Sequence, residues 1–250
     1  ISGWAPLAKE IGEFFHALYI LVLEGYGQTE GTTASTCNLP NRFRFGTVGP
    51  ALPNIEVRTA DDGEILIKGP TVFAGYFKND EATREVLGED GWLHTGDVGK
   101  LDEDGFLVVT DRKKDIIVTA GGKNVSPQNI ENELKGSTFV SQALVIGDRR
   151  PFVSALITLD EEESGKWARA RGLDGDLAAL ASRDDVRELI QGVVDDVNAG
   201  LARFEQVRAF AVLPRDFSAE EDEVTPTLKL RRRICEEHFA SEIERLYADR

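Results

Sequence analysis

The hexapeptide GYGQTE, which follows a short apolar run, contains side chains that could bind a nucleotide and its metal ion. Gly25 and Gly27 would let a planar base approach the backbone, and the ring of Tyr26 could stack on that base. The hydroxyl of Thr29 could bind a phosphate or carboxylate oxygen. Glu30 could hold Mg²⁺, which prefers a few carboxylates together with phosphates. The alternative interpretation is a glycine-rich turn with an incidental glutamate.

Two later runs, HTGD and DRKKD, add a carboxylate and a guanidinium. The carboxylate of Asp97 could accept hydrogen bonds from the two vicinal hydroxyls of a ribose. Arg112 has a fork of donors that suits ribose or phosphate. The alternatives are a turn capped by Asp97 and a solvated, mixed-charge linker. We interpret His94 as structural, since no acidic partner for it is evident in the sequence, and we see no functional signal in His16 or His238.

Lys229, near the carboxyl terminus, follows the tetrapeptide TPTL and precedes a basic run. When a carboxylate attacks the α-phosphorus of ATP, negative charge approaches negative charge. A cation at that point lowers the barrier electrostatically. The alternative is that Lys229 and residues 231–233 form the basic start of a helix that binds nucleic acid or anionic lipid.

Composition limits the class of protein. The chain has 250 residues, enough for one large or two small domains, and a formal net charge of −15, which argues against general nucleic-acid binding. Cys37 and Cys235 provide no disulfide framework and indicate a reducing compartment, so we expect a cytoplasmic protein, with membrane association left open. No apolar run approaches the ~18 residues of a membrane-spanning helix. Because the chain begins at Ile1 within a recognisable pattern, without a signal peptide, we interpret it as a fragment.

Up to residue 113 the pattern predicts strands and turns with two helices. In order, we expect a helix over 6–18 that begins at Pro6, a buried strand over 19–23, a hairpin of 55–58 and 64–67, a helix over 81–87, and a second hairpin with its turn at 102–105. Aspartate–glycine pairs support both hairpin turns. The apolar face of the first helix would comprise Leu7, Ile11, Phe14, Phe15 and Leu18.

After the run DRKKD the pattern changes to that of a small α+β domain. We predict a strand over 116–118, a helix over 127–135, strands over 143–146 and 153–159, a helix over 184–204, a strand over 207–213 and a helix after Lys229. The long helix has the clearest periodicity, because one face collects Val186, Leu189, Ile190, Val193, Val194, Val197 and Leu201. We therefore predict domains over 1–113 and 114–250.

The order and spacing of these runs resemble the adenylate-forming enzymes, the superfamily of acyl-coenzyme A synthetases, peptide-synthetase adenylation domains and beetle luciferases. The resemblance covers the whole chain but only the second half of such an enzyme. It implies an α/β fold: the tail of a large domain with a barrel-like β-subdomain, then a small mobile α+β domain. It also implies a hinge at Lys114, and that the pair Gly121 and Gly122 lets the pantetheine arm of coenzyme A pass close to the backbone.

The same resemblance implies that Tyr26, Asp97 and Arg112 hold the nucleotide, that Glu30 binds the metal and that Lys229 stabilises the transferring group. Two residues depart from the family pattern, since Trp4 and Leu228 occupy positions where glycine is common.

The intact pair of glycines and the surrounding sequence are most similar to the long-chain fatty acyl-coenzyme A synthetases. The implied substrates are a fatty acid, ATP with Mg²⁺, and coenzyme A. The phosphate-binding loop and most of the acyl tunnel would lie upstream of Ile1, so the missing region would be required for activity. Two alternatives stay open: a fatty acyl-AMP ligase that loads a carrier protein, and a non-catalytic nucleotide-binding or scaffolding domain.

Overall fold

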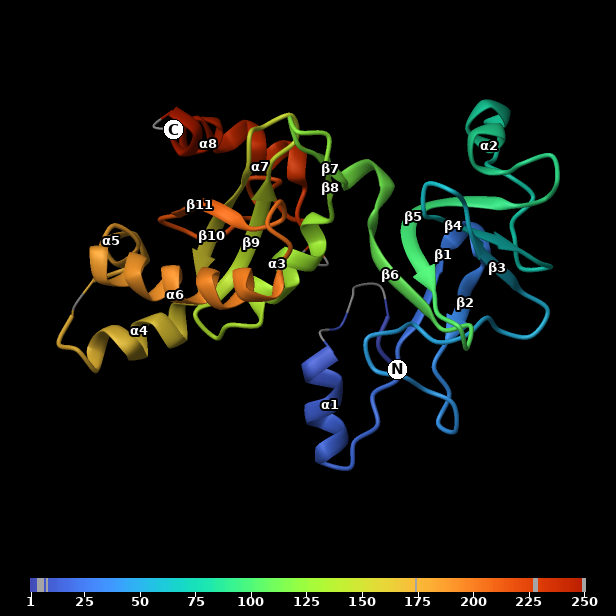
Figure 1. Ribbon diagram of the computed structural model, residues 1–250, viewed down its shortest axis with the longest axis horizontal. Helices are drawn as coiled ribbons and strands as arrows, with labels where there is room; N and C mark the ends of the chain where they lie inside the picture. Colours follow the sequence, from blue (N-terminus) through green and yellow to red (C-terminus); the bar gives the residue numbers. More distant parts are fainter. Residues whose placement is uncertain (4–6, 8, 174, 227–228, 249–250) are drawn as a thin grey trace. The chain divides into compact units, whose positions relative to one another are not determined.

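The computed structural model describes residues 1–3, 7, 9–173, 175–226 and 229–248. The chain divides into two compact units, unit 1 (Ile1–Asp115) and unit 2 (Ile116–Arg250), shown in Figure 1. The domain boundary predicted from the sequence, near Lys114, lies next to this division. The predictions that involve Trp4, Pro6, Thr227 and Leu228 fall outside the described residues.

Unit 1 is built on antiparallel strands. A curved sheet has the strand order β3-β4-β5-β6, and a smaller sheet pairs β1 with β2 (Figure 1). The strands are β1 (Gly25–Gln28), β2 (Thr33–Cys37), β3 (Glu56–Thr59), β4 (Glu64–Lys68), β5 (Leu93–Leu101) and β6 (Leu107–Arg112). The helices are α1 (Lys9–Ala17) and α2 (Asp80–Val86), with 3-10 turns η1 (Thr29–Gly31) and η2 (Lys113–Asp115). The buried core comprises Ile55, Ile65, Ile67, Leu93 and Leu107.

The segment 48–52 joins the two sheets of unit 1. Its backbone exchanges hydrogen bonds with Leu107 of β6, at 2.8 and 3.0 Å. It also bonds to Ser35 and Cys37 of β2, at 3.0 and 3.1 Å. Because β2 pairs with β1, this segment holds β1 close to the end of the larger sheet, where β5 and β6 carry polar residues.

Both hairpins and the short helix predicted for unit 1 are present, but the predictions for the first 23 residues were partly wrong. Helix α1 is shorter than expected, and its predicted apolar face is exposed, with Phe14 60% accessible. The contacts lie on the other side of the helix. There Gly12 approaches Phe45, and the ring of His16 packs against Phe43 and Phe45.

The strand expected over 19–23 is not formed. A strand needs hydrogen-bonding neighbours. Tyr19 and Ile20 instead bond back to His16 and Phe15 in the turn that ends α1, and Leu23 accepts a bond from the N–H of Ser2. Tyr19 has a φ of 62° and is 99% exposed. Bridging begins at Glu24, which pairs with Ser2, and strand β1 starts at Gly25, because β2 lies beside it there.

Unit 2 contains a three-stranded sheet with helices on both faces. The order is β11-β10-β9; β10 is antiparallel to β9 and parallel to β11. The strands are β7 (Ile117–Val118), β8 (Asn124–Val125), β9 (Val140–Ile146), β10 (Val153–Leu159) and β11 (Val207–Val212). The helices are α3 (Pro127–Lys135), α4 (Glu161–Arg169), α5 (Leu177–Ala181), α6 (Asp184–Gly200), α7 (Arg232–His238) and α8 (Ala240–Ala248).

The central strand of unit 2 is buried along its whole length, as expected for a strand covered on both faces. On one face, β10 packs with α3, α4, α5 and α6, through residues such as Ile130 and Ile190. On the other face it packs with α7 and α8, through residues such as Leu156 and Cys235.

The predicted strands and helices of unit 2 are present, although the long helix α6 ends at Gly200 and not at residue 204. Its predicted face packs into the core, apart from Leu189. Helices α4 and α5 were missed, because their apolar periodicity is weak. A capping signal was available for α4, where the side chain of Asp160 accepts from the N–H of Glu163 ahead of an acidic first turn. The terminal helix is in fact two, α7 and α8. In the part of the chain that the structure describes, no helix combines the length and apolarity needed to cross a membrane.

Candidate active site

Three side chains that the sequence analysis assigned to a nucleotide come together in unit 1. The phenol of Tyr26 donates a hydrogen bond of 2.6 Å to Oδ2 of Asp97. Nε of Arg112 lies 3.2 Å from Oδ1 of the same carboxylate. Asp97 and Arg112 are paired residues on β5 and β6. Asp97 is buried, whereas the side chain of Arg112 is 54% exposed. The cluster therefore combines an oriented carboxylate with a cation that a ligand could reach.

The protonation state of Tyr26 follows from this arrangement. Burial raises the pKa of Tyr26 well above its ordinary value of 10.0, and the charge of Asp97 and the hydrogen bond to it raise the pKa further. The phenol is therefore neutral at physiological pH and acts as a donor. The ring also packs against the apolar core of unit 1. These contacts are structural, and stacking of Tyr26 on a base stays a prediction.

Glu64, on β4, holds the segment that carries Asp97. Its buried carboxylate accepts from Nζ of Lys113 at 2.9 Å and from the N–H of Gly96 at 3.0 Å, and it lies 3.1 Å from Nδ1 of His94. Burial alone would raise the pKa of Glu64, but these hydrogen bonds together lower it below its ordinary value of 4.5. Our expectation that His94 lacks an acidic partner was wrong, because the partner comes from a different strand.

An open cleft of about 330 Å³ lies next to this cluster, lined by Thr95, Gly96, Arg112, Lys113 and Lys114. Lys113 is tied to unit 1 by Asp62 at 2.7 Å and by Glu64. Arg112 and Lys113 are both paired with carboxylates, which balance much of their charge, so the binding of a phosphate at this cleft stays a prediction.

The glycines of the GYGQTE run have a structural explanation. A β-carbon at Gly27 would lie 1.5 Å from the carbonyl oxygen of Thr33, because the register of β1 and β2 shifts between Tyr26 and Gly27. A β-carbon at Gly25 would lie 3.2 Å from the carbonyl oxygen of Thr36. Position 27 therefore needs glycine to admit β2, whereas a β-carbon at position 25 would make only a tight contact. The approach of a base to the backbone of either residue is a separate prediction.

Glu30 has a partner that the sequence analysis missed. The phenol of Tyr76 donates a hydrogen bond of 2.7 Å to Oε1 of Glu30, and the N–H of Phe73 donates to the Glu30 carbonyl at 2.8 Å. Thr29, one residue earlier, is exposed on η1. Within the described ranges, no group of three His, Cys, Asp or Glu side chains could hold a metal ion. Glu30 would therefore be a single protein carboxylate among ligands supplied by substrate and water.

Gly121 and Gly122 lie at the tip of the hairpin formed by β7 and β8. The N–H of Thr119 donates to the carbonyl of Lys123 at 3.0 Å, and the N–H of Gly122 donates to the carbonyl of Thr119 at 2.8 Å. Gly122 has a φ of +70°, which glycine adopts without strain. A β-carbon at Gly121 would be 3.9 Å from the Thr119 hydroxyl, and one at Gly122 would meet no described atom within 4 Å. The tip is therefore open.

Lys229 lies at the end of a closed loop in unit 2. The N–H of Thr225 donates to the carbonyl of Lys229 at 2.8 Å, and the N–H of Lys229 donates to the Thr225 hydroxyl at 3.0 Å. Val224 and Leu230 form an antiparallel bridge at the base. Lys229 is exposed. The loop therefore has a defined backbone at the point where its lysine projects.

The basic run after Lys229 has a structural explanation as well. Each of its three arginines pairs with a carboxylate: Arg231 with Asp222 at 2.8 Å, Arg232 with Glu131 at 2.6 Å, and Arg233 with Glu237 at 3.8 Å. The pair formed by Arg232 is mostly buried and ties α7 to α3. This neutralisation argues against a free basic surface at the start of α7.

Two family profiles match the chain. The profile described as AMP-binding enzyme C-terminal domain matches residues 114–250, and the profile described as AMP-binding enzyme matches residues 1–77. The chain belongs to the AMP-binding enzyme family. The predicted membership of the adenylate-forming superfamily is thereby confirmed.

This AMP-binding enzyme chain is 43% identical to the long-chain-fatty-acid–CoA ligase FadD15 of Mycobacterium bovis, over 99% of the chain and 41% of that relative. It is similar to the adenylation domain of a carboxylate reductase from Mycobacterium chelonae, with 29% identity and a TM-score of 0.80 over 99% of the chain and 38% of that structure. It is also similar to O-succinylbenzoate coenzyme A synthetase from Bacillus subtilis in complex with AMP, with 25% identity and a TM-score of 0.70 over 93% of the chain and 45% of that structure. The chain thus spans about two fifths of the length of these relatives.

Proposed function

We propose that this chain is the carboxyl-terminal part of an ATP-dependent long-chain fatty acid:coenzyme A ligase that releases AMP and pyrophosphate. The observation that carries the proposal is the meeting of Tyr26, Asp97 and Arg112 within hydrogen-bonding distance, in a chain 43% identical to a long-chain-fatty-acid–CoA ligase. These three residues were selected from the sequence as nucleotide contacts, and they are far apart along the chain.

In the first step, an oxygen of the fatty carboxylate attacks the α-phosphorus of ATP. The bond between that phosphorus and the bridging oxygen breaks, and pyrophosphate leaves. Asp97 accepts hydrogen bonds from the ribose hydroxyls, Arg112 binds ribose or phosphate, and Tyr26 stacks on adenine. Thr29 binds a phosphate or carboxylate oxygen. Lys229 stabilises the negative charge that accumulates around the α-phosphorus.

Glu30 fits as a protein ligand for Mg²⁺. This ion commonly uses one or two carboxylates together with substrate phosphates and water, and Glu30 is a single half-buried carboxylate oriented by Tyr76. When bound, the ion would neutralise phosphate charge. Tyr76 would then act through Glu30, by fixing the direction of its carboxylate.

In the second step, the thiol of coenzyme A attacks the acyl-AMP carbonyl, a thioester forms and AMP leaves. The fixed attachment of Lys113 and the change from unit 1 to unit 2 just beyond it support Lys114 as the hinge. The open tip at Gly121 and Gly122 supports a passage for the pantetheine arm. One face of a small domain cannot serve both steps at once, so unit 2 rotates between them.

The proposal is tested with the complete ligase and with the chain alone. The complete enzyme should catalyse fatty-acid-dependent exchange of pyrophosphate into ATP and should form acyl-coenzyme A when coenzyme A is added. The chain alone, at 41% of the relative's length, should show no exchange. Acyl-AMP formation followed by transfer only to a carrier protein would favour the carrier-loading alternative. Nucleotide binding with no exchange by the complete enzyme would favour a non-catalytic domain.

A further inference from the structure

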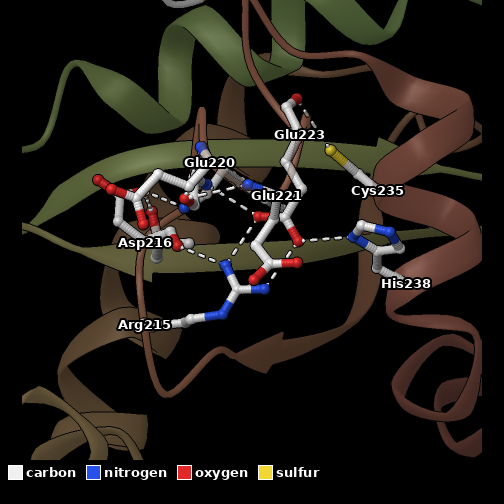
Figure 2. Close-up of polar contacts among 10 residues, drawn as sticks. Arg215, Asp216, Glu220, Glu221, Glu223, Cys235 and His238 are labelled. Atoms are coloured by element: carbon white, nitrogen blue, oxygen red, sulfur yellow. Dashed lines mark hydrogen bonds and ion pairs between the residues drawn. The ribbon is translucent and has the colours of Figure 1, made fainter.

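One buried carboxylate in unit 2, that of Glu223, organises the loop that carries Lys229. Its side chain is fully buried and faces four donors (Figure 2). Nη1 and Nη2 of Arg215 each donate at 2.7 Å, the N–H of Ser218 donates at 2.8 Å, and Nδ1 of His238 lies 3.0 Å away. Because an ionised carboxylate only accepts, Nδ1 of His238 must carry the hydrogen. His238, in which we saw no functional signal, therefore has a defined partner.

The backbone of Glu223 closes the same loop. Its N–H donates to the carbonyl of Ser218 at 2.9 Å, and its carbonyl accepts from the N–H of Arg231 at 2.8 Å. The thiol of Cys235 approaches that carbonyl at 3.4 Å. Residues 218 and 231, which lie on either side of the Lys229 loop, are therefore both tied to Glu223.

The donors around Glu223 are themselves anchored. Arg215 lies over the ring of Phe239 at 5.2 Å, and Cys235 and Phe239 belong to the apolar core beneath α7 and α8. Burial alone would raise the pKa of Glu223, but the hydrogen bonds lower it to about 2. The carboxylate is thus charged at physiological pH and fixed to a packed core.

We propose that Glu223 is the positioning residue for Lys229: its four-donor site fixes the base of the 218–231 loop and so fixes where the lysine projects. This inference rests on the proposed function, since it assumes that Lys229 acts in acyl-AMP formation. The ammonium of lysine lies at the end of a flexible stem, so the position of its backbone decides which points it can reach. A misplacement of about 1 Å can cost on the order of 100-fold in rate.

The matched variants are Glu223→Gln and Glu220→Gln. In Glu223→Gln, the side-chain NH₂ group would replace one acceptor oxygen and would face a donor of Arg215, Ser218 or His238. Glu220 is an exposed glutamate of the same loop, so its variant controls for the loss of a charge. Arg215→Lys is a second variant, which keeps the charge but removes the paired hydrogen bonds to Glu223.

The first measurement is amide hydrogen exchange on the full chain, which does not depend on catalysis. In Glu223→Gln, we expect the amides of Lys229 and Arg231 to exchange roughly 10- to 100-fold faster, which corresponds to the loss of one charge-assisted hydrogen bond. Arg215→Lys should show a smaller increase, and Glu220→Gln none. Wild-type protection of these amides in both Glu223→Gln and Arg215→Lys would overturn the inference.

The second measurement separates positioning from general destabilisation in the complete ligase. Glu223→Gln should lower pyrophosphate exchange by about 100-fold, while thioester formation from supplied acyl-AMP stays close to wild type. Equal losses in both half-reactions would show a merely structural role and overturn the inference. Should Lys229→Ala keep full pyrophosphate exchange, the assigned role of Lys229 fails. Should Lys229→Ala lose exchange while Glu223→Gln keeps it, the inference about Glu223 alone fails.

Discussion

The phenol of Tyr26 donates a 2.6 Å hydrogen bond to Asp97, which is 71 positions later in the sequence. Arg112 approaches the other oxygen of the same carboxylate. Both oxygens of Asp97 are thus engaged, and the orientation of the carboxylate is set before any ligand arrives. A preformed acceptor reduces the ordering cost of binding, which suits the proposed role of Asp97 as an acceptor of hydrogen bonds from ribose hydroxyls.

Replacing Asp97 by asparagine should weaken ATP binding by the complete ligase. The amide keeps the size of the side chain but has one acceptor oxygen and no charge for Arg112. We expect the KM for ATP to rise by about 10- to 100-fold, equivalent to one charge-assisted hydrogen bond, with the KM for the fatty acid nearly unchanged. Glu103→Gln, at an exposed position of the β5–β6 turn, is the control. An unaltered KM for ATP would argue against the ribose contact.

Replacing Lys229 by alanine should separate the two half-reactions. Loss of a preorganised cation at a developing negative charge costs about 100- to 1000-fold in rate, so acyl-AMP formation should fall by that factor. Thioester formation from supplied acyl-AMP should be largely intact. Lys135→Ala, at an exposed lysine of the same unit, should alter neither rate. The assigned role is refuted if both half-reactions decline together.

Replacing Gly121 by valine should affect only the second half-reaction. A β-carbon at this position would be 3.9 Å from the nearest described atom, the Thr119 hydroxyl, so the fold should tolerate it. A branched side chain at the hairpin tip would nevertheless obstruct an arm that passes close to the backbone. We expect a raised KM for coenzyme A with normal pyrophosphate exchange. Gly192→Ala, on α6, is the control, and an unchanged KM for coenzyme A would contradict the proposed passage.

Replacing Glu223 by glutamine should change the pH dependence of stability. The folded-state pKa of about 2 lies below the ordinary value of 4.5, so the carboxylate stabilises the fold above pH 4.5 and loses this contribution as the pH falls toward 2. This difference between the two pKa values corresponds to a contribution of roughly 3 kcal/mol to the free energy of unfolding at neutral pH. In urea unfolding, the difference in the free energy of unfolding between wild type and variant should be largest near pH 7 and should shrink below pH 4.5. A difference in unfolding free energy that stays constant with pH would contradict the stabilising role of the ionised Glu223 carboxylate. Glu220→Gln should unfold with the same free energy as wild type at each pH.

Turn residues, helix caps and apolar periodicity correctly predicted those helices and turns whose formation depends on residues close together in the sequence. The turn before Glu64, helix α2 with its Asn79 cap, and the long apolar face of α6 all follow from residues within a few positions of one another. The segment 19–23 and strand β1 could not be predicted in this way. An apolar run becomes a strand only beside a suitable neighbour, and the neighbour of β1 is set by the tertiary fold.

The candidate site likewise contains residues that could be predicted from local sequence and residues whose role depends on tertiary contacts. Tyr26, Asp97 and Arg112 were identified by residue type and order, and the structure brings them together. Glu64 and Tyr76 were missed because the partners that give them a role lie 30 to 49 residues away, for example His94 and Lys113 in the case of Glu64. A lone glutamate at the start of a strand carries no local sign that it will be buried among donors.

The close passage of β2 over Gly27 has a consequence for how this position can vary. A β-carbon at position 27 would lie only 1.5 Å from the carbonyl oxygen of Thr33, so no residue with a side chain fits there. In a codon-randomised library selected only for folding, position 27 should return glycine alone, whereas Gly192, on an open helix surface, should return nearly every amino acid except proline. Invariance at position 27 would thus be explained by the close pairing of β1 with β2, without any contribution from the ligand.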